Sequence, residues 1–156
     1  SCFGVDLLYP GLVLEIDAMA FDATHSRVLA APSLGKAFDD CFADGVTAAG
    51  ETWIGGQEAI DINGGVMCEG NIVGQAEIVF KKLKKLLGDA SVELTDIVRL
   101  NMFFLGEEDI STEFHAVMKV WQEIAPNANP TMTAVKAFEL SSPGVRFMAD
   151  CVAIKN

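Results

Sequence analysis

The chain has 156 residues, of which 51% are hydrophobic, and it carries a formal net charge of −11. This length and composition fit one domain with a real apolar core, and they exclude a disordered chain. The acidic charge disfavours nucleic acid as a partner, and no apolar run reaches the roughly 18–20 residues that cross a bilayer. The four cysteines form no CxxC pair, so neither a zinc site nor a redox motif is predicted. We expect an acidic cytoplasmic domain that binds neither nucleic acid nor membranes.

Two strands are predicted in the first sixty residues. Leu12–Phe21 alternates in the period of a half-buried strand, with one face formed by Leu12, Leu14, Ile16, Ala18 and Ala20. Thr52–Ile60 is a shorter candidate.

A helix is predicted over Gln75–Leu87, because its apolar residues repeat every three or four positions. Gly88 stands where a left-handed cap would end that helix. The other side of the helix holds the chain's one basic cluster, Lys81, Lys82, Lys84 and Lys85. We interpret this cluster as a solvated helix face.

The second half of the chain is predicted to contain a strand, a helix and two further strands, in that order. Asp96–Leu105 is rich in β-forming residues, and a helix is expected over Ser111–Ile124 with Asp109 or Ser111 as its cap. Strands are expected over Val135–Leu140 and Val145–Ile154, the latter with one face formed by Val145, Phe147, Ala149, Cys151 and Ala153. The order of elements predicts an α+β domain, in which two helices cover one face of a mixed β-sheet.

The first residues resemble the last ones. When Pro10-Gly11 is aligned with Pro143-Gly144, identical residues meet in further pairs: Leu7 with Leu140, Asp17 with Asp150 and Ala20 with Ala153. We therefore expect residues 1–21 to be the terminal β-hairpin of a preceding repeat, and residues 22–156 to be one complete domain.

Several segments in order resemble the RidA family, also called YjgF/YER057c/UK114. They are Phe42–Val46, Trp53–Gln57, Leu94–Leu105, Pro130–Val135 and Phe147–Ala153, and the N-terminal residues are similar to the family's ending. The resemblance implies a fold like that of chorismate mutase, a trimer, and small-molecule pockets between subunits. In better-known members these pockets hydrolyse enamines and imines to ketoacids and ammonia, without a metal or other cofactor.

The same resemblance places the site residues and shows where this chain departs from the family. The family's carboxylate-binding arginine falls on Met132, its pocket tyrosine on Phe42, its serine on Gly55 and its asparagine on His115. The carboxylate that would orient water falls on Asp150, and by repeat symmetry on Asp17. The remaining expected substrate-binding residues are Gly56, Gln57, Thr133 and Ala134, the last two through their backbone groups.

Ser1 suggests a second kind of chemistry. If residues 1–21 end an upstream repeat, a tandem precursor has been cut just before Ser1, and a serine hydroxyl can attack the preceding carbonyl to do so. The freed α-amine could then act as the base for the Ser1 hydroxyl, as in N-terminal nucleophiles. Removal of an initiator methionine, or a trimmed chain, explains Ser1 equally simply.

The sequence leaves three functions open. The first is a RidA-like hydrolase of C–N bonds at an intersubunit pocket, with a small-molecule substrate. The second is a self-processed amidohydrolase subunit with a catalytic Ser1, paired with an upstream subunit. The third is a non-catalytic ligand-binding or scaffold subunit, which the loss of the arginine, tyrosine and serine favours. Ribonuclease activity is disfavoured by the charge of −11 and by the lack of an acid–base pair around His115.

Overall fold

The computed structural model describes residues 3, 4, 7, 10–12, 14–16, 18–20, 26–29, 42–106 and 111–155. In that part of the chain six strands form one sheet in the order β1-β2-β3-β6-β4-β5. All neighbouring strands are antiparallel except β4 and β5, which are parallel. The strands are β1 (Arg27–Leu29), β2 (Gly45–Ala48), β3 (Glu51–Glu58), β4 (Ile97–Leu105), β5 (Thr131–Ala137) and β6 (Phe147–Ile154).

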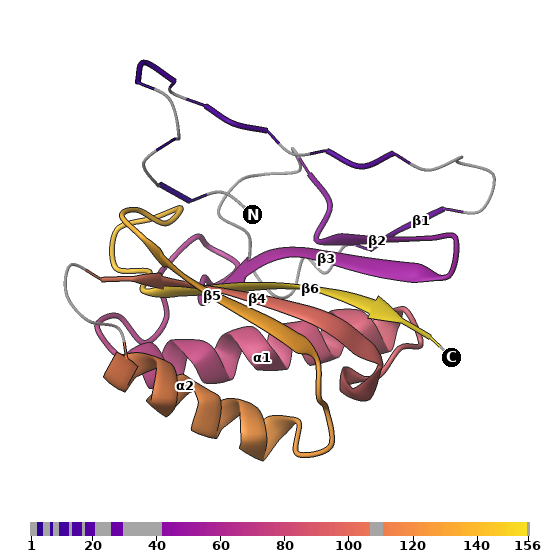
Figure 1. The fold of residues 1–156 in the computed structure, drawn as a ribbon. Coiled ribbons are helices and arrows are strands. Elements are labelled where there is room, and N and C mark those ends of the chain that lie inside the picture. Colours follow the sequence, from indigo (N-terminus) through magenta and orange to yellow (C-terminus); the bar gives the residue numbers. More distant parts are fainter. Residues whose placement is uncertain are drawn as a thin grey trace.

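Helices α1 (Ile72–Asp89) and α2 (Ser111–Ile124) both lie on one face of this sheet, as Figure 1 shows. The expected α+β fold is therefore confirmed. A short 3₁₀ helix, η3 (Leu94–Asp96), leads into β4. None of the helices in the described residues is long and apolar enough to cross a membrane.

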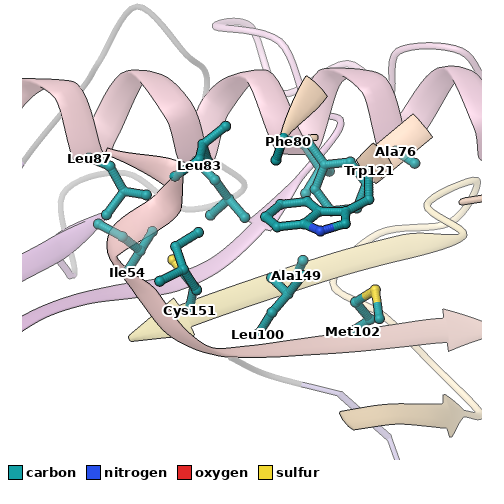
Figure 2. Packing of buried hydrophobic residues seen from close by; sticks show 14 of the residues in the cluster. Ile54, Ala76, Phe80, Leu83, Leu87, Leu100, Met102, Trp121, Ala149 and Cys151 are labelled. Atoms are coloured by element: carbon teal, nitrogen blue, oxygen red, sulfur yellow. The ribbon is translucent and has the colours of Figure 1, made fainter. Parts of the chain in front are cut away.

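The core lies between the helices and the sheet. Phe80 of α1 meets Trp121 of α2 and Phe147 of β6 edge-on, with ring centroids 5.1 and 5.5 Å apart. Figure 2 shows the α1 side chains pointing toward β-sheet residues such as Leu100 and Ala149. The face expected on the last strand is confirmed, because its members Val145, Phe147, Ala149, Cys151 and Ala153 are all buried.

Helix α1 differs from the expectation at its end and on its polar side. Asn71 caps its start by accepting a hydrogen bond from the Gly74 amide, but Gly88 lies inside the helix, which ends at Asp89 with Ala90 as its cap. The left-handed residue that follows is Ser91, with φ of 60°. The expectation that Lys82 is solvated is also wrong, since its side chain is buried.

The second helix has the expected bounds, whereas three strands shift. β3 ends at Glu58 and not at Ile60, and β6 begins at Phe147 and not at Val145. β5 covers Thr131–Ala137 instead of Val135–Leu140. Backbone pairing explains this last shift, because Thr131–Ala137 lies in parallel register with Arg99–Leu105. Polar residues can therefore belong to a strand because their backbone pairs with a neighbouring strand, although their side chains show no hydrophobic alternation. Asp109, one of the two expected caps, lies outside the described residues.

The strand expected over Leu12–Phe21 does not form in residues 12, 14–16 and 18–20, the described part of that range. Leu14 and Ile16 are 68% and 76% exposed. Alternation alone does not make a strand, because a strand also needs a neighbour for its backbone groups. Pro10-Gly11 does form a turn, and Gly4 pairs with Glu139 just beyond β5. The described N-terminal pieces lie on the side of the sheet away from the helices (Figure 1).

Candidate active site

The site is built on the face of the sheet that α1 and α2 do not cover, which we call the open face. Side chains alternate along a strand, so on β6 the core residues Ala149 and Cys151 fix the direction of their neighbours. Met148, Asp150 and Val152 therefore point to the open face. Asp150 is half-buried there, in the middle of the sheet.

A β-bulge on strand β3 lies opposite Asp150. Ile54 pairs with Cys151 and Gln57 pairs with Ala149, so the two residues between them, Gly55 and Gly56, face the single residue Asp150. A Cβ added to Gly55 would meet only the Asp44 carbonyl oxygen, at an ordinary 3.5 Å. The two bulge residues opposite Asp150 therefore carry no side chains.

An amide holds the Asp150 carboxylate from the other side. The Asn101 side chain on β4 donates a hydrogen bond to Asp150 Oδ1 at 2.7 Å, and Arg99 Nε donates to Asn101 Oδ1 at 3.1 Å. The carboxylate is thereby oriented by an amide, which a guanidinium orients in turn. Thr133 on β5 is the next residue in this row, because it pairs with Asn101.

The structure thus places Gly55, Gly56 and Asp150, three of the expected site residues, side by side on β3 and β6. A fourth expected residue, Thr133, continues the same row beyond Asn101, three strand spacings from the bulge. Gln57 lies beside the bulge and supports it, since its Nε2 donates to the Gly55 carbonyl at 3.2 Å. The Gly55 amide is already bonded to the Asp44 carbonyl at 2.8 Å. Within this chain that amide therefore stabilises the bulge, and it is not directed at a substrate.

Phe42 lies two residues before Asp44, whose carbonyl accepts from the Gly55 amide, and its side chain is 53% exposed. Two other expected residues point away from the row. Met132 and Ala134 alternate with Thr133 on β5, so their side chains point to the opposite face. Met132 is also three strand spacings, about 14 Å, from Gly55.

His115 is on the far side of the molecule from the row. Its Nδ1 lies 2.6 Å from the Ser111 carbonyl oxygen on α2, and it lines an open groove of about 590 Å³ between α1 and α2. The structure does not join His115 to the other expected residues within one chain. Ser1 and Asp17 lie outside the described residues, so their expected roles stay predictions.

Asn101, Arg99 and Glu58 were missed by the sequence reasoning. The first two had a usable signal, because they alternate with Leu100 and Met102 in a strand whose core face is apolar. Glu58 had none, since an acidic residue at the end of a strand is ordinarily solvated.

Glu58 lies on the open face at the end of β3, where it pairs with Met148. The Ser141 hydroxyl donates a short hydrogen bond to one carboxylate oxygen, and the Ser141 amide donates to the other at 3.2 Å. Burial raises the pKa of Glu58 above its ordinary 4.5, and it outweighs the opposing effects of Ser141 and of the Lys82 charge. The carboxyl group thus retains its proton to higher pH than an exposed glutamate.

Known proteins resemble the chain over this region. A family model described as Endoribonuclease L-PSP matches residues 38–155. Protein mmf1, a mitochondrial protein of Schizosaccharomyces pombe, is 31% identical over 112 residues, which are 70% of this chain and 65% of that protein. The match thus spans slightly under two thirds of that relative's length. Protein mmf2, mitochondrial, of the same yeast is 29% identical over 69% of this chain and 82% of its own.

Solved structures share the fold. Yeast Mmf1 superimposes with a TM-score of 0.71 at 19% identity, covering 85% of this chain and 100% of that chain. The YjgF gene product from E. coli gives a TM-score of 0.70 at 19% identity, over 83% of this chain and 99% of that one. RidA from the Antarctic bacterium Psychrobacter sp. PAMC 21119 gives 0.70 at 18% identity, with the same coverage.

Proposed function

Because the chain belongs to the endoribonuclease L-PSP family, which includes RidA and YjgF, we propose that it hydrolyses a C–N bond in small anionic imines or enamines. The pocket lies between copies of the chain. Asp150 orients the attacking water, and no metal takes part in the reaction.

The observation that supports this proposal is the environment of Asp150. Its carboxylate is half-buried, is held by the Asn101 amide at 2.7 Å, and lies opposite the two glycines of the Gly55–Gly56 bulge. A fixed carboxylate opposite residues without side chains can position a water molecule against a bound carbon atom. A merely solvated surface aspartate needs neither the amide nor the bulge.

The substrate's negative charge is met by groups on the neighbouring strands. Arg99 lies on the open face next to Asn101 and supplies the cation that Met132 does not. Among the described strands β5 is the last in the sheet order, so about half of its backbone groups, some of them in the Thr133–Ala134 segment, point away from β4. These N–H groups can bind a carboxylate or a developing negative charge.

A second copy completes the pocket. Met132 and the glycine bulge are about 14 Å apart in one sheet, too far to line one small pocket together. A neighbouring copy that packs its β5 edge beside the bulge brings the two regions together. A trimer is the assembly we propose for this arrangement.

The direct test is Asp150→Asn, which keeps the shape of the side chain and removes its charge. With an α-imino acid generated in situ by an amino-acid oxidase, we expect kcat/KM for ammonia release to fall about 100-fold or more. Asp89→Asn is the matched control, because Asp89 is an exposed residue at the end of α1 that pairs with Lys85. The kcat/KM of this control should equal that of the wild-type protein.

The alternative is a binding subunit without catalysis, and the replacement of the family's arginine by the apolar Met132 favours it. Wild-type protein that binds small carboxylates but does not speed ammonia release would establish this alternative and refute the hydrolase. Equal activity of Asp150→Asn and wild type would remove Asp150 from the mechanism.

A further inference from the structure

The open face holds a second carboxyl group close to Asp150. Glu58 pairs with Met148, and Asp150 is two residues further along β6, so Glu58 and Asp150 are diagonal neighbours on adjacent antiparallel strands. Such neighbours have Cα atoms roughly 7–8 Å apart, and their side chains point the same way. The two carboxyl groups therefore lie on one face of the sheet, on neighbouring strands.

The two carboxyl groups have different surroundings. Asp150 is half-buried and accepts a hydrogen bond from an amide, whereas Glu58 is 8% exposed and accepts from the Ser141 hydroxyl and amide. The ammonium group of Lys82 donates to the backbone carbonyls of Glu58 and Ile60, both at 2.8 Å. Lys82 therefore supports the backbone beneath Glu58 by two hydrogen bonds to carbonyl oxygens.

We propose that Glu58 is a second catalytic residue of this site, the acid that protonates the substrate nitrogen while Asp150 takes a proton from water. This inference rests on the proposed C–N hydrolysis. It assigns the residue that protonates the nitrogen when water adds to the C=N bond. Paired carboxyl groups in unlike environments are a recurrent solution for this division of acid and base.

The proton transfers balance over the full reaction. Water attacks the imine carbon and gives a proton to Asp150, the C=N π pair moves to nitrogen, and nitrogen takes the Glu58 proton to give a carbinolamine. The C–N bond then breaks as nitrogen takes the proton from Asp150 and leaves as ammonia. The hydroxyl proton returns to Glu58, and the products are the ketoacid and one ammonia.

Burial, the Lys82 charge and Ser141 act on the pKa of Glu58 within the described residues. The Lys82 ammonium on α1 lowers the pKa of Glu58, and the Asp150 carboxylate lies diagonally across on β6. Asp44 and Asp61 act on Lys82, whose own pKa is lowered to about 8 by burial. The Ser141 hydroxyl also lowers the pKa of Glu58, because it stabilises the ionised form.

The experiment measures kcat/KM against pH for the full chain with the same α-imino acid, in wild type, Glu58→Gln and Ser141→Ala. An acid is active below its pKa, so wild-type kcat/KM should fall as pH rises through the pKa of Glu58. We call this fall the alkaline limb of the pH profile. We expect Glu58→Gln to lower kcat/KM about 100-fold and to abolish this limb. Ser141→Ala should move the limb to higher pH, because it removes a group that lowers that pKa.

Glu77→Gln is the matched control, since it makes the same change on the exposed side of α1. A Glu58→Gln variant that keeps the wild-type rate and pH profile would overturn the role of Glu58, and the hydrolase would stand if Asp150→Asn is still inactive. Wild-type protein with no activity would overturn both proposals. If Glu58→Gln fails to fold, an unshifted limb in Ser141→Ala overturns the inference by itself.

Discussion

Lys82 is buried, although the other lysines of its cluster, Lys81, Lys84 and Lys85, are exposed. It stands in a run of lysines, yet its side chain is only 4% exposed and its Nζ donates to two backbone carbonyls at 2.8 Å. Loss of water around the amine lowers its pKa to about 8, although Asp44, Glu58 and Asp61 oppose the shift. A charged amine at this position is thus less favourable in the folded protein than in the unfolded chain.

This shift predicts a pH-dependent stability. The pKa of Lys82 is lower in the folded protein, about 8, than its ordinary 10.5. Between those values the unfolded chain binds more protons, so the contribution of Lys82 to the free energy of unfolding rises with pH. Urea titrations at several pH values measure the free energy of unfolding. Its value for wild type minus its value for Lys82→Met should rise by up to about 1.4 kcal/mol per pH unit from pH 8 to 10.

The matched control is Lys84→Met, an exposed lysine two positions further along α1. Its difference from wild type should stay constant over the same range. A constant difference for Lys82→Met as well would show that the buried amine does not titrate below its ordinary pKa.

At the scale of elements, one buried amide joins α1 to the start of β6. Gln75 is fully buried, its Nε2 donates to the Gly144 carbonyl at 2.8 Å, and its Oε1 accepts from the Arg146 amide at 2.7 Å. The helix thereby satisfies two backbone groups of the turn that leads into β6.

Gln75→Leu keeps the size of the side chain but leaves both backbone groups without a partner. Each buried unpaired group costs about 1–3 kcal/mol, so for two groups we expect a loss of about 2–6 kcal/mol in the free energy of unfolding. Chemical denaturation measures it. Gln122→Leu on the exposed side of α2 is the control, and equal stability of the two variants would show that water replaces the Gln75 contacts.

At the scale of the whole molecule, the open face remains partly apolar. Val28 is 66% exposed, and its row continues through Val46 and Trp53 to Val152. A sheet face of this kind is usually covered by another layer. Copies of the chain are the covering layer that the proposed intersubunit pocket requires.

A trimer of this 16.7 kDa chain predicts a mass of about three times that value in sedimentation equilibrium. Val152→Asp places a charge in the middle of the open face and should reduce the mass to that of one chain. Ile62→Asp makes the same change at an exposed apolar residue outside the sheet, and it should leave the assembly intact. A wild-type monomer would contradict the intersubunit pocket.

The sequence by itself determined two things. It predicted the elements whose apolar residues repeat with a strong period, and it indicated the family. The helix over Ser111–Ile124 and the buried face of the last strand are examples, because helical and strand periods record which side of an element is apolar. Order and spacing of short segments then pointed to the family, and through it to Asp150 and the glycines.

Only the tertiary structure decided which of these residues meet. Periodicity gives the face of a residue on its own element, but it does not say which element lies alongside or in what register. Pairing of β3 with β6 set the bulge against Asp150, and packing of α1 buried Lys82 beneath Glu58. Those contacts join residues far apart in the chain, and they arise from backbone hydrogen bonding and burial, which no local pattern encodes.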